Sequence, residues 1–136
     1  MFKRIDHVAF TVKDMERSVD FYEEYLGFRR YYEHGVPVPT VEKIAYLKLG
    51  DTILELIHMP DSSGSADQGF HFCLESDDFD GDYSRLKGAG VPIDTEPHPV
   101  EARETGEEGW RRVVFTGPDG ELIEFRGQGP SVHLKP

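Results

Sequence analysis

Two histidines and two glutamates stand at matching places in the two halves of the chain. His7 and His71 lie 64 residues apart (71 − 7), each at the start of a segment that alternates apolar strand formers with other residues. Glu55 and Glu124 lie 69 residues apart (124 − 55), each among aliphatic residues that follow a turn. Imidazole and carboxylate ligands suit divalent Zn, Ni, Co, Mn and Fe. The pattern therefore predicts a site for one such metal, and an octahedral ion would keep two positions for water or substrate.

The four candidate ligands also share a place on the non-core face of a strand. Successive side chains of a strand point to opposite faces. Val8, Phe10 and Val12 share the face that a helix would cover, so His7 belongs to the other face. The same alternation puts the other three opposite apolar neighbours, namely His71 opposite Phe70, Phe72 and Leu74, Glu55 opposite Leu54 and Leu56, and Glu124 opposite Ile123 and Phe125. If the halves bring these faces together, they form a cluster of two histidines and two glutamates.

Each half reads as a strand, a helix and three further strands. Asp14 and Asp78, also 64 residues apart (78 − 14), are N-cap candidates, and Gly27 suits the end of the first helix. Apolar residues at i, i+4, i+7 and i+11 follow each cap, which predicts one buried stripe per helix. The expected elements are Ile5–Val12, Asp14–Leu26, Phe28–His34, Lys43–Leu49 and Gly50–Leu56 in the first half, and Gly69–Glu75, Phe79–Gly90, Val91–Thr95, Arg111–Phe115 and Asp119–Phe125 in the second.

The repeat predicts a single domain over residues 1–136 that is built from two modules. We place the first module at about 3–58, a polar linker at 59–68, the second module at about 69–127 and a tail at 128–136. A polar loop over 97–109 is long enough to act as a lid or to contact substrate.

Composition excludes several classes of partner. Twenty-six acidic against 15 basic side chains give a net charge of −11, which argues against non-specific nucleic-acid binding and against docking on anionic lipid. The single cysteine, Cys73, permits no intramolecular disulfide and fits a reducing compartment. No apolar run approaches the ~20 residues of a membrane span, and the start lacks the features of a signal peptide. We therefore expect a cytoplasmic protein with a small-molecule substrate.

Four segments resemble the vicinal oxygen chelate superfamily, which includes glyoxalase I, methylmalonyl-CoA epimerase, extradiol dioxygenases, fosfomycin-resistance enzymes and bleomycin-binding proteins. They read IDHVAFTVKDMERSVDFYEEYLGF, LGDTILELI, GFHFCLESDD and GPDGELIEF, and the resemblance covers about residues 3–127. It implies an α+β fold of two βαβββ modules whose sheets curve into a cup around one divalent metal. His7, Glu55, His71 and Glu124 match the four ligand positions of that family.

Individual residues relate the chain to different branches of the family. Glu55 matches the glutamate of glyoxalase I, where epimerases usually have glutamine, extradiol dioxygenases use three ligands, and bleomycin-binding members lack the metal set. Thr11 stands where glyoxalase I has an arginine for glutathione, and no asparagine follows Glu55 closely. Residues 41–56, VEKIAYLKLGDTILEL, look closer to the epimerases. The ligands are thus of glyoxalase type, while glutathione as the substrate carrier is in question.

The resemblance implies a metal-dependent lyase or isomerase that works through a metal-stabilised enolate of a small carbonyl substrate. A ligand carboxylate serves as the base, Glu124 before Glu55. An epimerase, an extradiol dioxygenase and a non-catalytic drug-binding protein remain alternatives.

Three further residues are weaker substrate candidates. Arg111 and Arg112 are consecutive, so only one of them can face the cup. That arginine would bind a carboxylate or phosphate of the substrate, or alternatively form a surface salt bridge. Trp110 would line the pocket or cover the loop end. Many family members pair the first module of one chain with the second of another, so we expect a homodimer.

Overall fold

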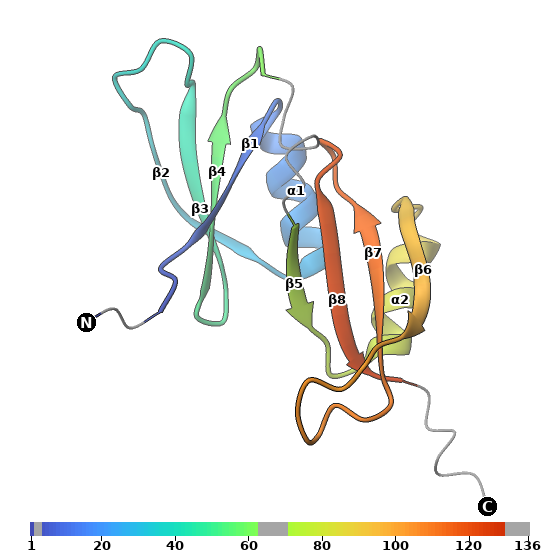
Figure 1. Ribbon diagram of the computed structural model, residues 1–136. Helices are drawn as coiled ribbons and strands as arrows, with labels where there is room; N and C mark the ends of the chain where they lie inside the picture. Colours follow the sequence, from blue (N-terminus) through green and yellow to red (C-terminus); the bar gives the residue numbers. More distant parts are fainter. Residues whose placement is uncertain (2–3, 63–70, 130–136) are drawn as a thin grey trace, which may run out of the picture. The chain divides into compact units, whose positions relative to one another are not determined.

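The computed structural model describes residues 1, 4–62 and 71–129. The chain divides into two compact units, Met1–Gly69 with Pro118–Gly120 and Phe70–Gly117 with Glu121–Pro136. Each unit carries one helix and one four-stranded mixed sheet (Figure 1). Of the expected linker, residues 63–68 lie outside the described part of the chain, as do residues 130–136 of the expected tail.

The first unit has the order strand, helix, three strands. Its elements are β1 (Val8–Val12), α1 (Met15–Leu26), β2 (Arg29–His34), β3 (Lys43–Leu49) and β4 (Thr52–His58). The strand order is β1-β4-β3-β2, with β1 parallel to β4 and the other neighbours antiparallel. β4 therefore lies in the middle of the sheet, where both neighbouring strands hold the backbone of Glu55.

The helix α1 follows its sequence signals closely. The Asp14 side chain accepts a hydrogen bond from the Arg17 backbone N–H at 3.1 Å, as an N-cap does. Gly27 ends the helix in the left-handed conformation with φ 81°, which glycine adopts without strain. Val19 and Tyr22 are fully buried on the expected stripe, and α1 contacts β2 and β4.

A short turn from the far end of the chain completes the first unit. Asp119 is 8% exposed and its carboxylate accepts from the Lys13 backbone N–H at 3.2 Å, the Arg17 guanidinium at 3.1 Å and the Ser18 hydroxyl at 3.3 Å. These donors surround the first turn of α1, so the buried carboxylate also complements the positive end of the helix dipole.

The second unit repeats this topology. Its elements are β5 (His71–Glu75), α2 (Phe79–Gly88), β6 (Ile93–Pro99), β7 (Trp110–Thr116) and β8 (Leu122–Gln128), in the sheet order β5-β8-β7-β6. Asp78 caps α2 by accepting from the Gly81 N–H at 3.2 Å. Phe79 and Leu86 are buried, and the Phe79 ring packs on Phe125 at 5.3 Å between centroids. The predicted α+β fold of two βαβββ modules is confirmed.

The boundaries of several elements differ from expectation. β1 begins at Val8, because its ladder with β4 starts at the Val8–Leu54 pair, so His7 lies just before the strand. β4 and β8 run two or three residues beyond the expected ends, to His58 and Gln128. β6 continues through Pro99, because it is the edge strand of its sheet, where prolines cost no ladder hydrogen bond. The expected loop over 97–109 therefore begins at residue 100.

No helix within residues 1, 4–62 and 71–129 is long and apolar enough to cross a membrane.

Candidate metal centre

The first unit brings His7 and Glu55 together. Glu55 is the β4 partner of Ala9 in the parallel ladder, so His7, two residues before Ala9, falls on the same face. His7 Nε2 lies 3.5 Å from Glu55 Oε1. The Glu55 side chain is 13% exposed and that of His7 is 38% exposed, so the pair is half-open to solvent.

A neighbouring carboxylate orients the His7 ring. Asp6 Oδ2 lies 3.0 Å from His7 Nδ1, and this hydrogen bond holds the pKa of Asp6 below its usual value. When Nδ1 donates to a carboxylate, the proton is on Nδ1 and the lone pair of Nε2 is available to a metal. The contact therefore sets the tautomer that ligation requires and directs it toward Glu55.

A tyrosine holds the other oxygen of Glu55. Tyr46 is the direct antiparallel partner of Glu55 in the β3–β4 ladder, and its hydroxyl donates to Glu55 Oε2 at 2.7 Å. Because the bond favours the protonated phenol, the pKa of Tyr46 rises to about 12. Glu55 thus has Oε2 fixed by a neutral donor and Oε1 turned toward His7.

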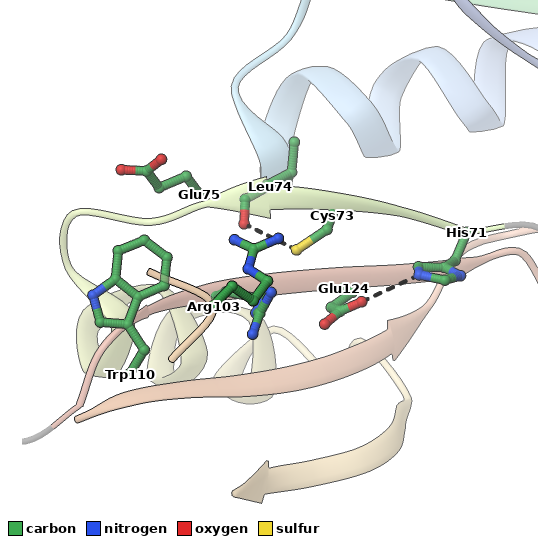
Figure 2. A pocket seen from close by; sticks show the side chains of 8 residues that line it. His71, Cys73, Leu74, Glu75, Arg103, Trp110 and Glu124 are labelled. Carbon is green, nitrogen blue, oxygen red and sulfur yellow. Dashed lines mark hydrogen bonds and ion pairs between the residues drawn. The ribbon is translucent and has the colours of Figure 1, made fainter. Parts of the chain in front are cut away.

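The second unit repeats the pair with His71 and Glu124. His71 Nε2 lies 3.2 Å from Glu124 Oε1 (Figure 2). Arg112 Nε donates to Glu124 Oε2 at 2.7 Å. The Arg112 NH1 group donates in turn to His98 Nε2 at 3.3 Å, while His98 Nδ1 donates to the Glu96 carbonyl. Glu124 is 7% exposed, so its carboxylate depends on these partners.

The two His–Glu pairs fit divalent metal ligation. Two ligands that each lie ~2.1 Å from one ion are roughly 3.0–3.4 Å apart at octahedral or tetrahedral angles. The N···O separations of 3.5 and 3.2 Å fall near this range. Among the described residues no group of three or more His, Cys, Asp or Glu gathers at one place. Each unit therefore offers two ligands, and the donor chemistry suits the metals named above.

A pocket of about 370 Å³ opens beside the second pair. Figure 2 shows His71 and Trp110 at its two ends, with Glu124, Cys73 and Arg103 between them. Burial of its sulfur, with the Glu124 charge nearby, raises the pKa of the Cys73 thiol to about 11. The thiol is therefore neutral at pH 7 and is a poor nucleophile.

The loop after β6 supplies the pocket with an anchored arginine. Arg103 donates to Glu107 through its backbone N–H at 2.9 Å and through Nε and NH2 at 3.1 and 2.6 Å. The Arg103 guanidinium lowers the pKa of Glu107 to about 2, so this carboxylate stays charged at all ordinary pH values. The clamp fixes the loop and gives the expected lid segment a defined conformation at the pocket.

The weaker substrate candidates separate as the strand alternation requires. Arg112 faces Glu124, whereas Arg111 donates to the Pro97 carbonyl at 3.2 Å and lies over the Phe79 ring. Trp110 lines the pocket.

Sequence reasoning missed four residues of these two sites, Asp6, Tyr46, Arg103 and Arg126. Asp6 directly precedes a candidate ligand, and Arg126 follows Glu124 by two, on its face. Tyr46 could have been found by pairing the β3–β4 hairpin outward from its turn. Arg103 carried no signal, since it lies in an irregular loop.

Comparison with known proteins identifies the family of this chain. The family model described as the glyoxalase/bleomycin resistance protein/dioxygenase superfamily matches residues 4–125. The chain belongs to this superfamily. It is 31% identical to the metallothiol transferase FosB of Shouchella clausii, over 91% of this chain and 80% of FosB. It is 33% identical to the mitochondrial methylmalonyl-CoA epimerase of Bos taurus, over 90% of this chain and 73% of the relative.

Among solved structures, the trypanothione-dependent glyoxalase I of Leishmania major superposes with a TM-score of 0.72 and 26% identity. The match covers 93% of this chain and 88% of the Leishmania major chain. The predicted family is confirmed, and its named relatives are enzymes of different reaction types. Membership of the superfamily therefore supports an enzyme. It does not specify the reaction, which has to be argued from the residues of the two sites.

Proposed function

We propose that this superfamily member is a metal-dependent lyase or isomerase of the glyoxalase I type, in which one divalent ion is held by His7, Glu55, His71 and Glu124. The observation that carries the proposal is the duplicated His–Glu pair, with N···O separations of 3.5 and 3.2 Å. In both pairs a protein donor holds one carboxylate oxygen, which leaves the other beside the histidine.

The reaction begins with removal of a proton next to a carbonyl of a small substrate. A bound divalent ion supplies a Lewis acid that stabilises the negative charge developing on the carbonyl oxygen. The chain supplies the base, and we assign this role to Glu124 with Glu55 as the second carboxylate. Arg112 and Tyr46 orient these two side chains through the oxygens that do not face the histidines.

Return of the proton decides between two products. Delivery to the neighbouring carbon gives a hydroxy-acid derivative, as in the glyoxalase I reaction, whereas delivery to the opposite face of the same carbon inverts a stereocentre. The alternative to the glyoxalase I-type reaction is therefore epimerisation. It is supported by the 33% identity to a methylmalonyl-CoA epimerase over 90% of the chain. Glutathione is not proposed as the carrier, because Thr11 replaces the arginine of glyoxalase I.

We further propose a homodimer in which His7 and Glu55 of one chain share an ion with His71 and Glu124 of a second chain. The basis is that each unit contributes only two ligands among the described residues. Light scattering on the size-exclusion peak is expected to give twice the mass of 15.5 kDa. A purely monomeric peak that retains metal would overturn the shared site.

The central experiment measures α-proton exchange in D2O by NMR. Protein reconstituted with Zn, Ni, Co, Mn or Fe is incubated with methylmalonyl-CoA and, separately, with the methylglyoxal–glutathione hemithioacetal. We expect metal-dependent exchange or turnover with one of them. Chelator-treated protein is the matched control. Failure to bind any of the five metals would overturn the proposal and favour a drug-binding protein.

A further inference from the structure

Arg126 is the residue of the second-unit pocket whose role remains unexplained. It follows Glu124 by two positions in β8 and therefore lies on the same face of the sheet. In the ladder it stands opposite Glu75 on one side and Arg112 on the other. It lines the pocket together with Trp110 and Arg103.

The Arg126 Nε–H is buried and has no hydrogen-bond partner within the described part of the chain. A buried donor of this kind is unfavourable and is rare in folded proteins. Arginine presents its N–H groups as a planar fork that matches a carboxylate or a phosphate. Because Arg126 also lines the pocket, an anion bound there would supply an acceptor for its guanidinium.

The neighbouring charges strengthen this interpretation. Arg103 is paired with Glu107 and Arg112 with Glu124. Arg126 forms no ion pair with any acidic residue that the structure describes, although Glu75 stands opposite it in the ladder. Arg103, the other arginine that lines the pocket, thus has a carboxylate partner, as does the neighbouring Arg112, whereas Arg126 has no ion-pair partner among the described residues.

We propose that Arg126 binds an anionic group of the substrate, a carboxylate or a phosphate, and thereby selects anionic substrates. This rests on the proposed function in one respect, which is that the molecule bound beside Glu124 is the one that reacts. The anion lies in the pocket next to the His71–Glu124 pair, so it holds the substrate by a group distinct from the carbonyl. Arg126 is a binding residue and takes no part in proton transfer.

Trp110 provides a direct readout, because it is the single tryptophan of the chain and lines the same pocket. Metal-free protein is titrated with inorganic phosphate in one arm and acetate in the other, at constant ionic strength set with sodium chloride. Saturable fluorescence change is expected in at least one arm, and the arm that saturates tells phosphate from carboxylate. Absence of saturation in both arms would overturn the proposal.

Variants assign the binding to Arg126. Arg126→Gln is expected to weaken anion binding at least tenfold, and Arg126→Lys, which keeps the charge, by less. Arg85→Gln is the matched control, since it removes the same charge from an exposed helix residue paired with Asp82. Thermal unfolding of each variant verifies the fold. Unchanged binding in folded Arg126→Gln would contradict the assignment.

Metal content separates this inference from the proposed function. Arg126→Gln is expected to retain the metal content of the unaltered protein, because Arg126 is not a ligand. With a turned-over substrate, KM is expected to rise about tenfold while kcat changes little. If the unaltered protein binds no metal yet shows Arg126-dependent anion binding, the proposed function fails and the anion site stands.

Discussion

The two His–Glu pairs are built alike and held differently. In each, histidine Nε2 faces Oε1 of the glutamate, at 3.5 Å in the first unit and 3.2 Å in the second. Oε2 accepts a bond of 2.7 Å in both, from the neutral Tyr46 hydroxyl at Glu55 and from the Arg112 guanidinium at Glu124. The two units therefore share the geometry of the His–Glu pair, while the residue that orients each glutamate differs.

This difference affects how firmly each carboxylate is held. Both bonds reach a carboxylate, but only the Arg112 guanidinium adds an opposite charge, so Glu124 is anchored more firmly than Glu55. Glu124 is also the more buried, at 9% side-chain exposure against 13%. We infer that Glu124 offers a precisely placed base, whereas Glu55 has more freedom to move away from a metal. Substitutions of the histidines, of the glutamates and of their orienting partners test whether the two pairs differ in this way.

The largest effect is expected from removal of a ligand. His71→Ala should lower metal occupancy and reduce turnover by at least ~10³-fold, since metal catalysis depends on the full ligand set. His7→Ala should do the same if the two pairs share one ion. His58→Ala is the control, because its Nε2 pairs with the Lys13 carbonyl. Metal analysis of the purified variants is the measurement, and full occupancy in His7→Ala would separate the two pairs.

Exchange of the two carboxylates for amides ranks next. Glu124→Gln should abolish measurable turnover with the fold intact, a loss of about 10²–10⁴-fold that is typical of a missing general base. Glu55→Gln should cost less, because glutamine still offers an oxygen to a metal. Single-turnover kinetics on both variants give the comparison. Full activity in Glu124→Gln would remove that residue as the base, and a larger loss at Glu55 would reverse the assignment.

The orienting partners are expected to have smaller and unequal effects. Arg112→Met leaves a buried carboxylate without its cation and should cost about 1.5–3 kcal/mol of metal binding or stability. Tyr46→Phe removes a hydrogen-bond donor from a carboxylate but no opposite charge, and it is expected to cost less than Arg112→Met. The two are compared by metal titration and by denaturant unfolding. Equal losses would mean that charge contributes nothing to the difference between the pairs.

The sequence predicted what depends on local pattern. The duplicated strand–helix order, the Asp14 and Asp78 caps and the shared face of each histidine and glutamate followed from period, cap and alternation, and the structure places them as expected. Tyr46 and Arg126 were missed, because their contacts arise from cross-strand register. Arg103 reaches the pocket from an irregular loop, whose path no periodic pattern encodes. The association of the two pairs around one ion stays a prediction.

The smallest effect concerns the protonation of Tyr46. Its bond to Glu55 raises the pKa to about 12, above the usual value of 10. The protonated phenol is therefore favoured in the folded state, and this stabilisation is fully present below pH 10. It is lost as the pH rises from 10 to about 12. Ultraviolet titration near 295 nm should show one tyrosine that ionises near pH 12.

Tyr46→Phe should remove that late step and flatten the decline in unfolding free energy between pH 10 and 12. Tyr31→Phe is the control, since it should leave the late step in place. The same late step should vanish in Glu55→Gln, because the carboxylate is the largest cause of the shift. If instead it persists there, burial and the neighbouring tyrosines set the value, and the first pair is held less by its hydrogen bond than its geometry indicates.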